Sequence, residues 1–188
     1  MNVRTNLTRE DWIEAAQHVL VSGGVDAVRV DTLAKQMKIT RGSFYYHFKS
    51  RDELLAGILS AWRARATEDV ILNLRHTQQS PAQQLQHLLE LPSHGQRAKE
   101  AAAIELAIRA WARRDKQARQ AMDEVDSHRL TYIEGLLLQA GSTEPEAQAR
   151  AYLIYSYQLS QSLLPQDSER ARMIGTILIP GQTPSECI

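Results

Sequence analysis

The chain has 188 residues, with 22 Lys and Arg against 22 Asp and Glu, so its formal net charge is zero. Its single cysteine, Cys187, excludes a disulfide framework within the chain and indicates a reducing compartment. No apolar run approaches the roughly 18–20 residues of a membrane span, and the N-terminus lacks the apolar core of a signal peptide. We therefore expect a cytoplasmic protein with no membrane partner.

The distribution of residue types favours helices and permits DNA binding. Only 9 Gly and 6 Pro interrupt long stretches rich in Ala, Leu, Gln and Arg, which indicates an all-α protein. Residues 1–50 hold seven Lys or Arg and five Asp or Glu, whereas residues 51–188 hold fifteen and seventeen. A slightly basic N-terminal part is compatible with DNA binding, because each cation that contacts a phosphate releases counterions from the DNA.

Three helices are predicted in the first fifty residues. Thr8 and Asp11 form a variant of the capping box, and apolar residues follow at helical spacing. The next two helices are short and separated by a tight turn, the pattern of a helix-turn-helix. The expected helices run from Thr8 to Gly23-Gly24, from about Val30 to the turn at Lys38-Ile39, and from Arg41 to about His47.

Capping signals also delimit the later helices. Ser50 begins a full capping box that opens a long helix, Ser80 begins a second, and Thr143 caps a further helix. Gly141 and Pro165 are expected to end helices, and no strand pattern occurs. The expected helices span about 51–75, 81–91, 97–113, 116–140, 144–164 and 168–178, with a loop at 92–98.

Residues 39–51 carry the strongest functional signal. The segment combines hydroxyls, aromatic rings and cations in a very short helix, a mixture that a packed core alone does not require. Because Tyr45, Tyr46 and His47 are adjacent, some of them must point outward on any helix. Such a surface suits phosphates and base edges, so we interpret the segment as the recognition half of the helix-turn-helix.

Four stretches of the N-terminal part match a known pattern: Thr8–Ala16, Gly24–Val30, Leu33-Ala34 and Thr40–Leu55, the last with the run Gly-Ser-Phe-Tyr-x-His-Phe. In these stretches the chain resembles the tetracycline-repressor (TetR) family of bacterial transcription regulators. The resemblance implies an all-α fold of about nine helices. It implies a DNA-binding domain at 6–66, with the helix-turn-helix at about 29–48, and a larger ligand-sensing and dimerisation domain at 67–188.

The function implied by this resemblance is that of a sequence-specific transcriptional regulator. We expect a homodimeric, ligand-responsive repressor on a palindromic operator, with half-sites ~34 Å apart or at multiples of that spacing. An effector bound in the C-terminal domain would shift the helix that follows the recognition helix. The expected partners are duplex DNA, a second copy of the chain and an unknown small-molecule effector.

One residue departs from the family pattern. The family usually has Gly where this chain has Lys38. That position favours a left-handed backbone, which costs Lys on the order of 1 kcal/mol relative to Gly. Lys38 could offset this cost by reaching a phosphate, and plain exposure to solvent is an equal alternative.

Ten residues are candidates for contact with DNA. Arg41 is the first candidate for reading guanine, with a phosphate contact or a solvated cation as the alternatives. Tyr45 resembles the family's phosphate-binding tyrosine, and Tyr46 could contact a phosphate or a thymine methyl group. The alternative for both tyrosines is packing against the first helix. His47 suits a structural hydrogen bond nearly as well as a DNA contact. The full set is Arg29, Thr40, Arg41, Gly42, Ser43, Tyr45, Tyr46, His47, Lys49 and Arg51. Arg4, on a short N-terminal arm, could enter a minor groove.

The C-terminal part offers weaker candidates. Glu105, Arg109 and Arg129 are interpreted first as structural ion pairing between helices and second as polar anchors of a ligand cavity. Aromatic residues at helical spacing are core more often than ligand contacts. The candidates for the cavity are Trp62, Glu105, Arg109, Arg129, Tyr132, Tyr155 and Gln158. A helix that is apolar over much of its circumference needs two neighbours, which suggests a dimer interface at Ala147, Ala151, Ile154 and Leu159.

The sequence gives no support for catalysis. The six histidines have no metal-ligand spacing, and neither a Gly-rich phosphate loop nor a nucleophile elbow occurs. We expect no enzyme activity, metal or cofactor. The alternative function is a helical dimeric module that binds a ligand or a protein and has lost DNA binding.

Overall fold

The computed structural model describes residues 7–68, 79–90, 95–161, 163–164 and 167–181. These residues form helices and connecting turns, as the all-α prediction requires, with no strand in the described ranges. The chain divides into two compact units, one made of Met1–Arg65 with Ala103–Met122 and the other of Ala66–Ala102 with Asp123–Ile188. The predicted domains were continuous segments, whereas the first unit also takes in part of the later helices.

The N-terminal helices of the first unit begin and end close to the predicted residues. In α1, Asp11 N–H donates to the Thr8 hydroxyl at 3.2 Å, and Thr8 N–H donates to the Asp11 carboxylate at 2.7 Å, which completes the predicted capping box. Gly24, with φ of 73°, ends α1. The elements are α1 (Arg9–Gly23), the 3₁₀ turn η1 (Val25–Ala27), α2 (Val30–Gln36), the 3₁₀ helix η2 (Arg41–Tyr46) and α3 (Arg51–Arg63).

An aromatic cluster forms the core beneath the helix-turn-helix. Trp12 of α1 meets Phe44 of η2 edge to face, with ring centroids 5.3 Å apart, and Phe48 stacks on Phe44 at the same distance. All three side chains are buried. Gly57 of α3 lets α1 approach closely, since a Cβ there would lie 3.2 Å from the Ile13 side chain. The core thus fixes η2 against α1, and α1 against α3.

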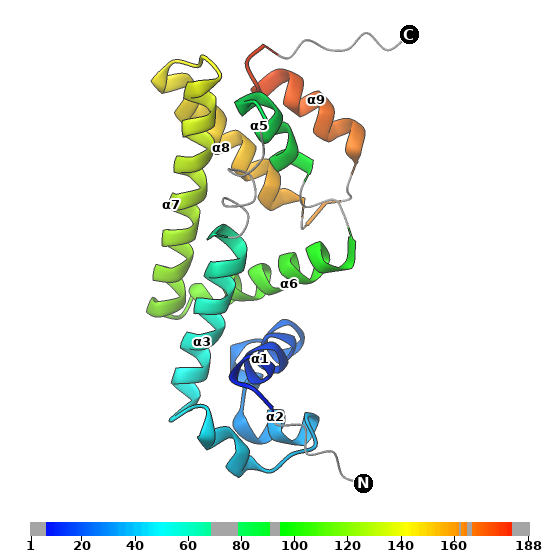
Figure 1. Cartoon of the computed structure of the whole chain (residues 1–188), viewed down its shortest axis with the longest axis vertical. Helices are drawn as coiled ribbons and strands as arrows, with labels where there is room; N and C mark the ends of the chain where they lie inside the picture. The colour runs from blue at the N-terminus through cyan, green and yellow to red at the C-terminus, as the bar shows by residue number, and fades with distance from the viewer. Residues whose placement is uncertain (1–6, 69–78, 91–94, 162, 165–166, 182–188) are drawn as a thin grey trace. The chain divides into compact units, whose positions relative to one another are not determined.

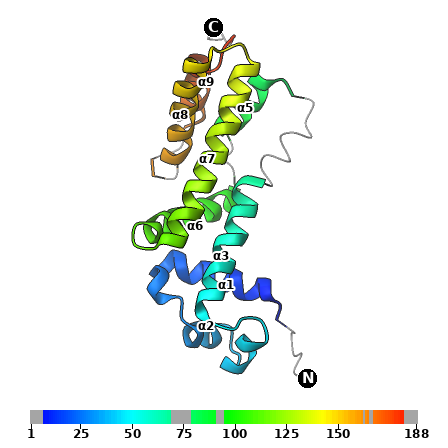
Figure 2. The same cartoon turned by 90° about the vertical axis from the view of Figure 1, so that its left-hand side faces the viewer.

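The second unit contains α5 (Pro81–Glu90), α8 (Glu144–Ser160) and α9 (Ser168–Leu178), which pack against one another (Figures 1 and 2). Its core joins leucines of α5 to α8 and to the later part of α7 (Lys116–Gln139). Helices α6 (Gly95–Ala112) and α7 each contribute residues to both units.

Some helix ends differ from the sequence-based prediction. Helix α6 begins at Gly95 rather than near Arg97, and α8 ends at Ser160 rather than Leu164. The N–H groups of residues 163 and 164 both donate to the Ser160 carbonyl at 2.9 Å, so the helix closes in a tightened turn. Helix α3 continues as a π-helical turn, Ala64–Glu68. The predicted extension to residue 75, the arm at Arg4 and Cys187 lie outside the described residues.

No helix among the described residues is long and apolar enough to cross a membrane. The same residues contain no group of three or more His, Cys, Asp or Glu side chains arranged to hold a metal ion.

Candidate nucleic-acid interface

The turn between α2 and η2 is a Schellman motif. Ile39 N–H donates to the Ala34 carbonyl at 3.0 Å, and Lys38 N–H donates to the Lys35 carbonyl at 3.2 Å. This pattern places Lys38 in the left-handed region, with φ of 55°, the one non-glycine residue with positive φ in the described part of the chain. The sequence-based expectation of a left-handed backbone at Lys38 is confirmed, and the strain of a side chain at that position is real.

The short helix expected from Arg41 to about His47 is present as η2 and is wound as a 3₁₀ helix. Its tighter winding sends Phe44 into the core, while 54% of Tyr45 and 88% of Tyr46 remain exposed. The alternative in which both tyrosines pack against α1 therefore does not hold for Tyr46. Phe44 contacts the ring of Tyr45 edge to face, with centroids 5.3 Å apart, which fixes the direction of the tyrosine hydroxyl.

Arg41 is held by two partners at the surface. One terminal guanidinium nitrogen lies 3.5 Å from the carboxylate of Asp31 on α2, and the other donates to the Tyr45 hydroxyl at 3.3 Å. The hydrogen bond to Tyr45, followed by the charge of Asp31, raises the pKa of Arg41 above its ordinary value. Sequence reasoning missed Asp31, because only the packing of α2 against η2 brings it near Arg41.

The remaining polar residues of η2 and its ends are accessible to different degrees. Thr40 stands at the N-cap position of η2 but makes no capping hydrogen bond through its side chain, and it is exposed. A Cβ at Gly42 would have the Thr40 hydroxyl 3.8 Å away as its nearest neighbour, so packing within the chain does not require glycine there. Ser43 and His47 are half-buried.

Capping at the start of α3 leaves the Lys49 side chain exposed. Lys49 N–H donates to the Glu53 carboxylate at 2.7 Å, and Glu53 N–H donates to the Ser50 hydroxyl at 3.2 Å. The Ser50 half of the predicted box is present, whereas the Glu53 carboxylate accepts from the N–H of Lys49 in place of that of Ser50. Together the two bonds fix the junction between η2 and α3.

Arg51 has a structural role that the sequence did not indicate. Its guanidinium donates to the carbonyls of Val25 and Val28, both at 2.6 Å, and so joins the first turn of α3 to the segment before α2. Arg29 also faces a backbone group, donating to the Asp26 carbonyl at 3.1 Å. The predicted phosphate contacts of these two residues stay predictions, and Arg51 already uses two of its donors within the chain.

Residues predicted for a ligand cavity are distributed over both units. Trp62 of α3 is buried in the first unit. In the same unit, Arg109 pairs with Glu105 at 2.9 Å, and both of these residues lie on α6. In the second unit Arg129 donates to the Ala66 carbonyl and the Tyr155 hydroxyl, at 3.1 and 3.2 Å. Three further hydrogen bonds of candidate residues in the second unit run from Tyr155 to Asp126, from Tyr132 to Gln84, and from Gln158 to the Leu88 carbonyl.

The predicted dimer face lies largely within the chain's own core. Ala147, Ala151 and Ile154 are buried in the core that α8 forms with α5 and α7 of the same chain, and Leu159 is half-buried against that core. The chain's own helices cover Ala147, Ala151 and Ile154, whereas Leu159 keeps part of its surface exposed. The exposed apolar side chains lie elsewhere on α8 and on α9: Tyr152, Leu153, Met173 and Ile177.

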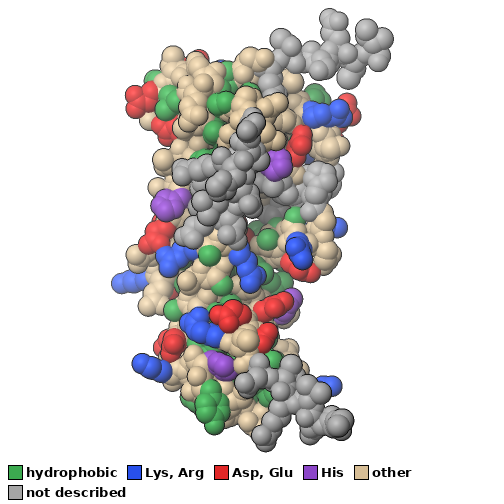
Figure 3. Space-filling model, viewed as in Figure 1, with side chains coloured by type: hydrophobic (Ala, Val, Ile, Leu, Met, Phe, Trp, Pro, Cys, Tyr) green, Lys and Arg blue, Asp and Glu red, His purple; other side chains and the backbone are tan. Residues whose placement is uncertain are grey.

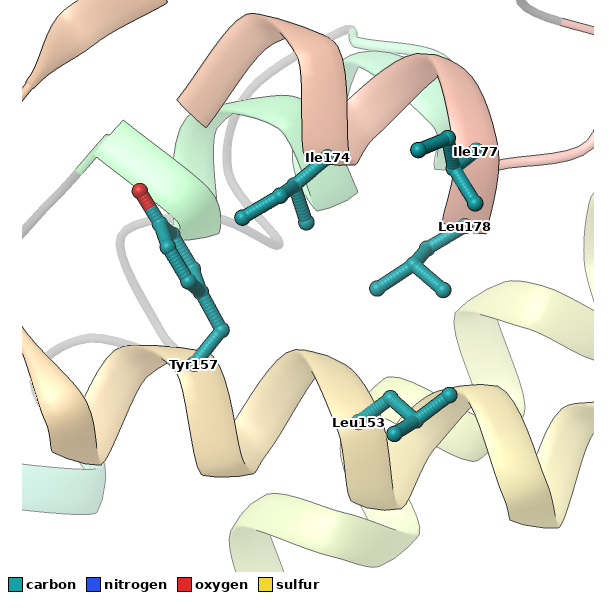
Figure 4. Close-up of a pocket in the computed structure, with 5 residues that line it drawn as sticks. All are labelled: Leu153, Tyr157, Ile174, Ile177 and Leu178. Atoms are coloured by element: carbon teal, nitrogen blue, oxygen red, sulfur yellow. The ribbon is translucent and has the colours of Figure 1, made fainter. Parts of the chain in front are cut away.

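A shallow apolar groove accompanies these exposed residues. Figure 4 shows Leu153 and Tyr157 on α8 facing Ile174, Ile177 and Leu178 on α9 across the groove. Its lining is almost wholly apolar.

Charges on the first unit are mixed in sign. On the face of the molecule in Figure 3, Lys and Arg side chains alternate with Asp and Glu side chains over the N-terminal helices. Such a surface steers DNA weakly, so binding there depends on a few directed contacts.

Comparisons with known proteins agree with this geometry. Residues 13–58 match the family model for bacterial regulatory proteins of the tetR family. The HTH-type transcriptional regulator SrpR of Pseudomonas putida is 37% identical over 54 residues, which are 29% of this chain and 25% of SrpR. The chain thus matches only a quarter of that relative's length.

Two solved structures extend the likeness over almost the whole chain. A TetR-family member from Streptomyces coelicolor A3 is 25% identical, with a TM-score of 0.67 and coverage of 93% of this chain and 99% of that one. AibR in complex with isovaleryl coenzyme A and operator DNA has a TM-score of 0.68 at 15% identity, covering 92% of this chain and 98% of its own. The second likeness concerns the fold alone.

Proposed function

We propose that this chain, whose residues 13–58 match the model for bacterial regulatory proteins of the tetR family, is a ligand-responsive repressor of that family that binds a palindromic operator as a homodimer. The observation that carries the proposal is the surface of η2, where Arg41, Tyr45 and Tyr46 are exposed next to a buried aromatic core. An exposed tyrosine pair on a rigid base has little use for stability and suits contacts with DNA.

The residues at the DNA surface have distinct roles. Arg41 reads a base in the major groove, because its planar group can donate two hydrogen bonds to O6 and N7 of guanine. Tyr45 binds a phosphate and fixes the register, and Tyr46 contacts a phosphate or a thymine methyl group. Gly42 gives the backbone room to approach the DNA. Phosphate contacts come from Thr40, Ser43, His47, Lys49 and Arg29, while Arg51 acts mainly by holding α3 to the helix-turn-helix.

A second copy of the chain covers the groove between α8 and α9. Ile177 is 72% exposed and Leu153 is 52% exposed, and both line the groove. Exposed apolar side chains clustered on two adjacent helices are typical of protein interfaces rather than of free surface. A two-fold axis there would present two copies of η2 to the DNA and explain a palindromic operator.

The effector acts through the second unit. An effector weakens operator binding only if it binds the DNA-free state more tightly than the DNA-bound state. Arg129, Tyr155 and Asp126 form a hydrogen-bonded group on α7 and α8 that a polar ligand could engage. AibR, whose structure holds both isovaleryl coenzyme A and operator DNA, shares the fold, so this fold can accommodate a small molecule together with DNA.

Alanine replacement of Arg41 and Tyr45 tests the DNA-binding role. We expect the double variant to lose at least about 30-fold in operator affinity, from two contacts of about 1–3 kcal/mol each, while keeping its helicity and oligomeric state. Arg113→Ala, an exposed cation after α6, is the matched control and should bind as the wild type does. Equal operator affinity for the double variant and the control would contradict the proposal.

The alternative is a dimeric ligand-binding or protein-interaction module without DNA binding. The strained Lys38 in the turn is the observation that favours it, because a helix-turn-helix under selection for stability would have glycine there. This alternative requires that the wild-type protein enrich no DNA sequence, with or without effector.

A further inference from the structure

The ion pair between Asp31 and Arg41 connects the two helices of the helix-turn-helix. Asp31 lies in the first turn of α2 and Arg41 at the start of η2, and their side chains approach to 3.5 Å. We propose that Asp31 is a positioning residue that orients the Arg41 guanidinium for guanine and so determines the sequence specificity of this protein. The inference rests on the proposed function and adds a residue to it.

The geometry fixes the plane of the guanidinium from two sides. Asp31 contacts one terminal nitrogen and the Tyr45 hydroxyl accepts from the other, so the group is held at both ends. Each terminal nitrogen carries two N–H groups, and one contact at each leaves one N–H on each nitrogen. The O6 and N7 acceptors of guanine require two donors, and the N–H groups that remain on the two terminal nitrogens can supply them.

Orientation matters because arginine otherwise loses much side-chain freedom on binding. An arginine that is already held in one rotamer loses less conformational entropy when it meets the base. A flexible arginine can also turn to a neighbouring phosphate, which carries no sequence information. Asp31 disfavours that alternative, since its own negative charge lies beside the guanidinium.

The same carboxylate lowers affinity for DNA in general. Asp31 is 75% exposed, so in the free protein the pair is screened by water and contributes little to stability. Next to DNA its charge is repelled by phosphates on every sequence, and only a correctly placed guanine lets Arg41 offset that repulsion. Asp31 therefore increases discrimination while it weakens non-specific binding.

The test compares affinities for two duplexes that differ at one base pair. The duplexes are the operator selected from random DNA by the wild type and the same operator with the Arg41-dependent G·C pair replaced by A·T. That pair is the one at which Arg41→Ala loses its preference. We expect the wild type to prefer G·C by about 5- to 150-fold, the range of one bidentate contact.

In Asp31→Asn we expect that preference to fall to about 3-fold or less, with non-specific DNA bound as tightly as by the wild type or more tightly. Asp31→Glu should restore most of the preference. Glu14→Gln removes one exposed charge from α1 and should leave the preference unchanged. Equal thermal unfolding of the Asp31 variants and the wild type excludes misfolding.

A wild-type G·C preference that survives in Asp31→Asn would overturn the inference and leave the proposed function standing. If the wild type selects no operator at all, the proposed function fails and this inference fails with it.

Discussion

The two compact units differ in how their polar functional candidates are engaged. In the first unit, Tyr46 and Tyr45 are exposed on η2, with Arg41 held between Asp31 and the Tyr45 hydroxyl. In the second unit, Tyr155, Tyr132 and Gln158 are bonded to neighbours from the same chain. The exposed side chains of η2 can therefore contact DNA without rearrangement. An effector that binds Tyr155, Tyr132 or Gln158 must first replace the hydrogen bonds that these residues make within the chain.

Disruption of the apolar groove of the second unit should have the largest effect. We expect Ile177→Glu combined with Leu153→Glu to give a monomer with at least 100-fold weaker operator binding, because each monomer reads only one half-site. Sedimentation and DNA titration measure both effects. Leu138→Glu, at an exposed leucine of α7, should remain dimeric. A double variant that stays dimeric would place the interface elsewhere.

The second prediction concerns the anchor of α3. Arg51→Lys should lower the free energy of unfolding by about 2 kcal/mol, because the lysine ammonium lacks the fixed planar pair of donors with which the guanidinium bonds both carbonyls at 2.6 Å. The melting temperature should then fall by about 4–8 °C. Arg113→Lys controls for the change of residue type. An unchanged melting temperature in Arg51→Lys would mean that these two bonds do not hold the helix-turn-helix to α3.

The third prediction has opposite signs for stability and for binding. Lys38→Gly should raise the free energy of unfolding by about 1 kcal/mol, since glycine adopts the left-handed backbone without strain. If Lys38 contacts a phosphate, the slope of log affinity against log salt should become shallower by about 0.9 in this variant. Lys35→Gln, an exposed neighbour in α2, serves as the comparison for charge alone. A salt slope in Lys38→Gly equal to that of the wild type would mean that Lys38 makes no phosphate contact.

The smallest effect concerns the two capping boxes, one in each unit. Hydrogen bonds from Thr8 lower the pKa of Asp11 below its ordinary 3.8, and those from Thr143 lower the pKa of Glu146 below 4.5. A depressed pKa contributes stability above the ordinary value, and that contribution is lost as the pH falls through the folded value. Asp11→Asn with Glu146→Gln should therefore be less stable than the wild type at pH 7, with the difference shrinking below pH 4. Urea titrations at several pH values measure it, and a pH-independent difference would contradict the assignment.

Much of the fold could be predicted from the sequence, because its signals are local. The hydroxyl and acid of Thr8 and Asp11, and those of the box at Ser50, lie three residues apart, so the start of each helix can be read directly. The left-handed backbone at Lys38 was also predictable, since the turn sits at a fixed place in the pattern. The 3₁₀ winding of η2 was not, because it depends on how Phe44 and Phe48 pack against α1.

The candidate site was less predictable where its contacts are long-range. Arg51 bonds carbonyls 23 and 26 residues away, and nothing near it in sequence indicates that role. Ala147, Ala151 and Ile154 were assigned to a dimer because periodicity identifies an apolar face without saying what covers it. The structure covers that face with α5 and α7 and leaves a different face of α8 exposed.

The central claim is that η2 reads DNA as one half of a symmetric pair. Selection of random duplex DNA by the purified, effector-free protein at low salt tests it most directly. We predict enrichment of a palindrome, and loss of that enrichment when Arg41 and Tyr45 are replaced by alanine. Absence of any enriched sequence, with a folded dimeric protein in the assay, would contradict the claim and favour the interaction module.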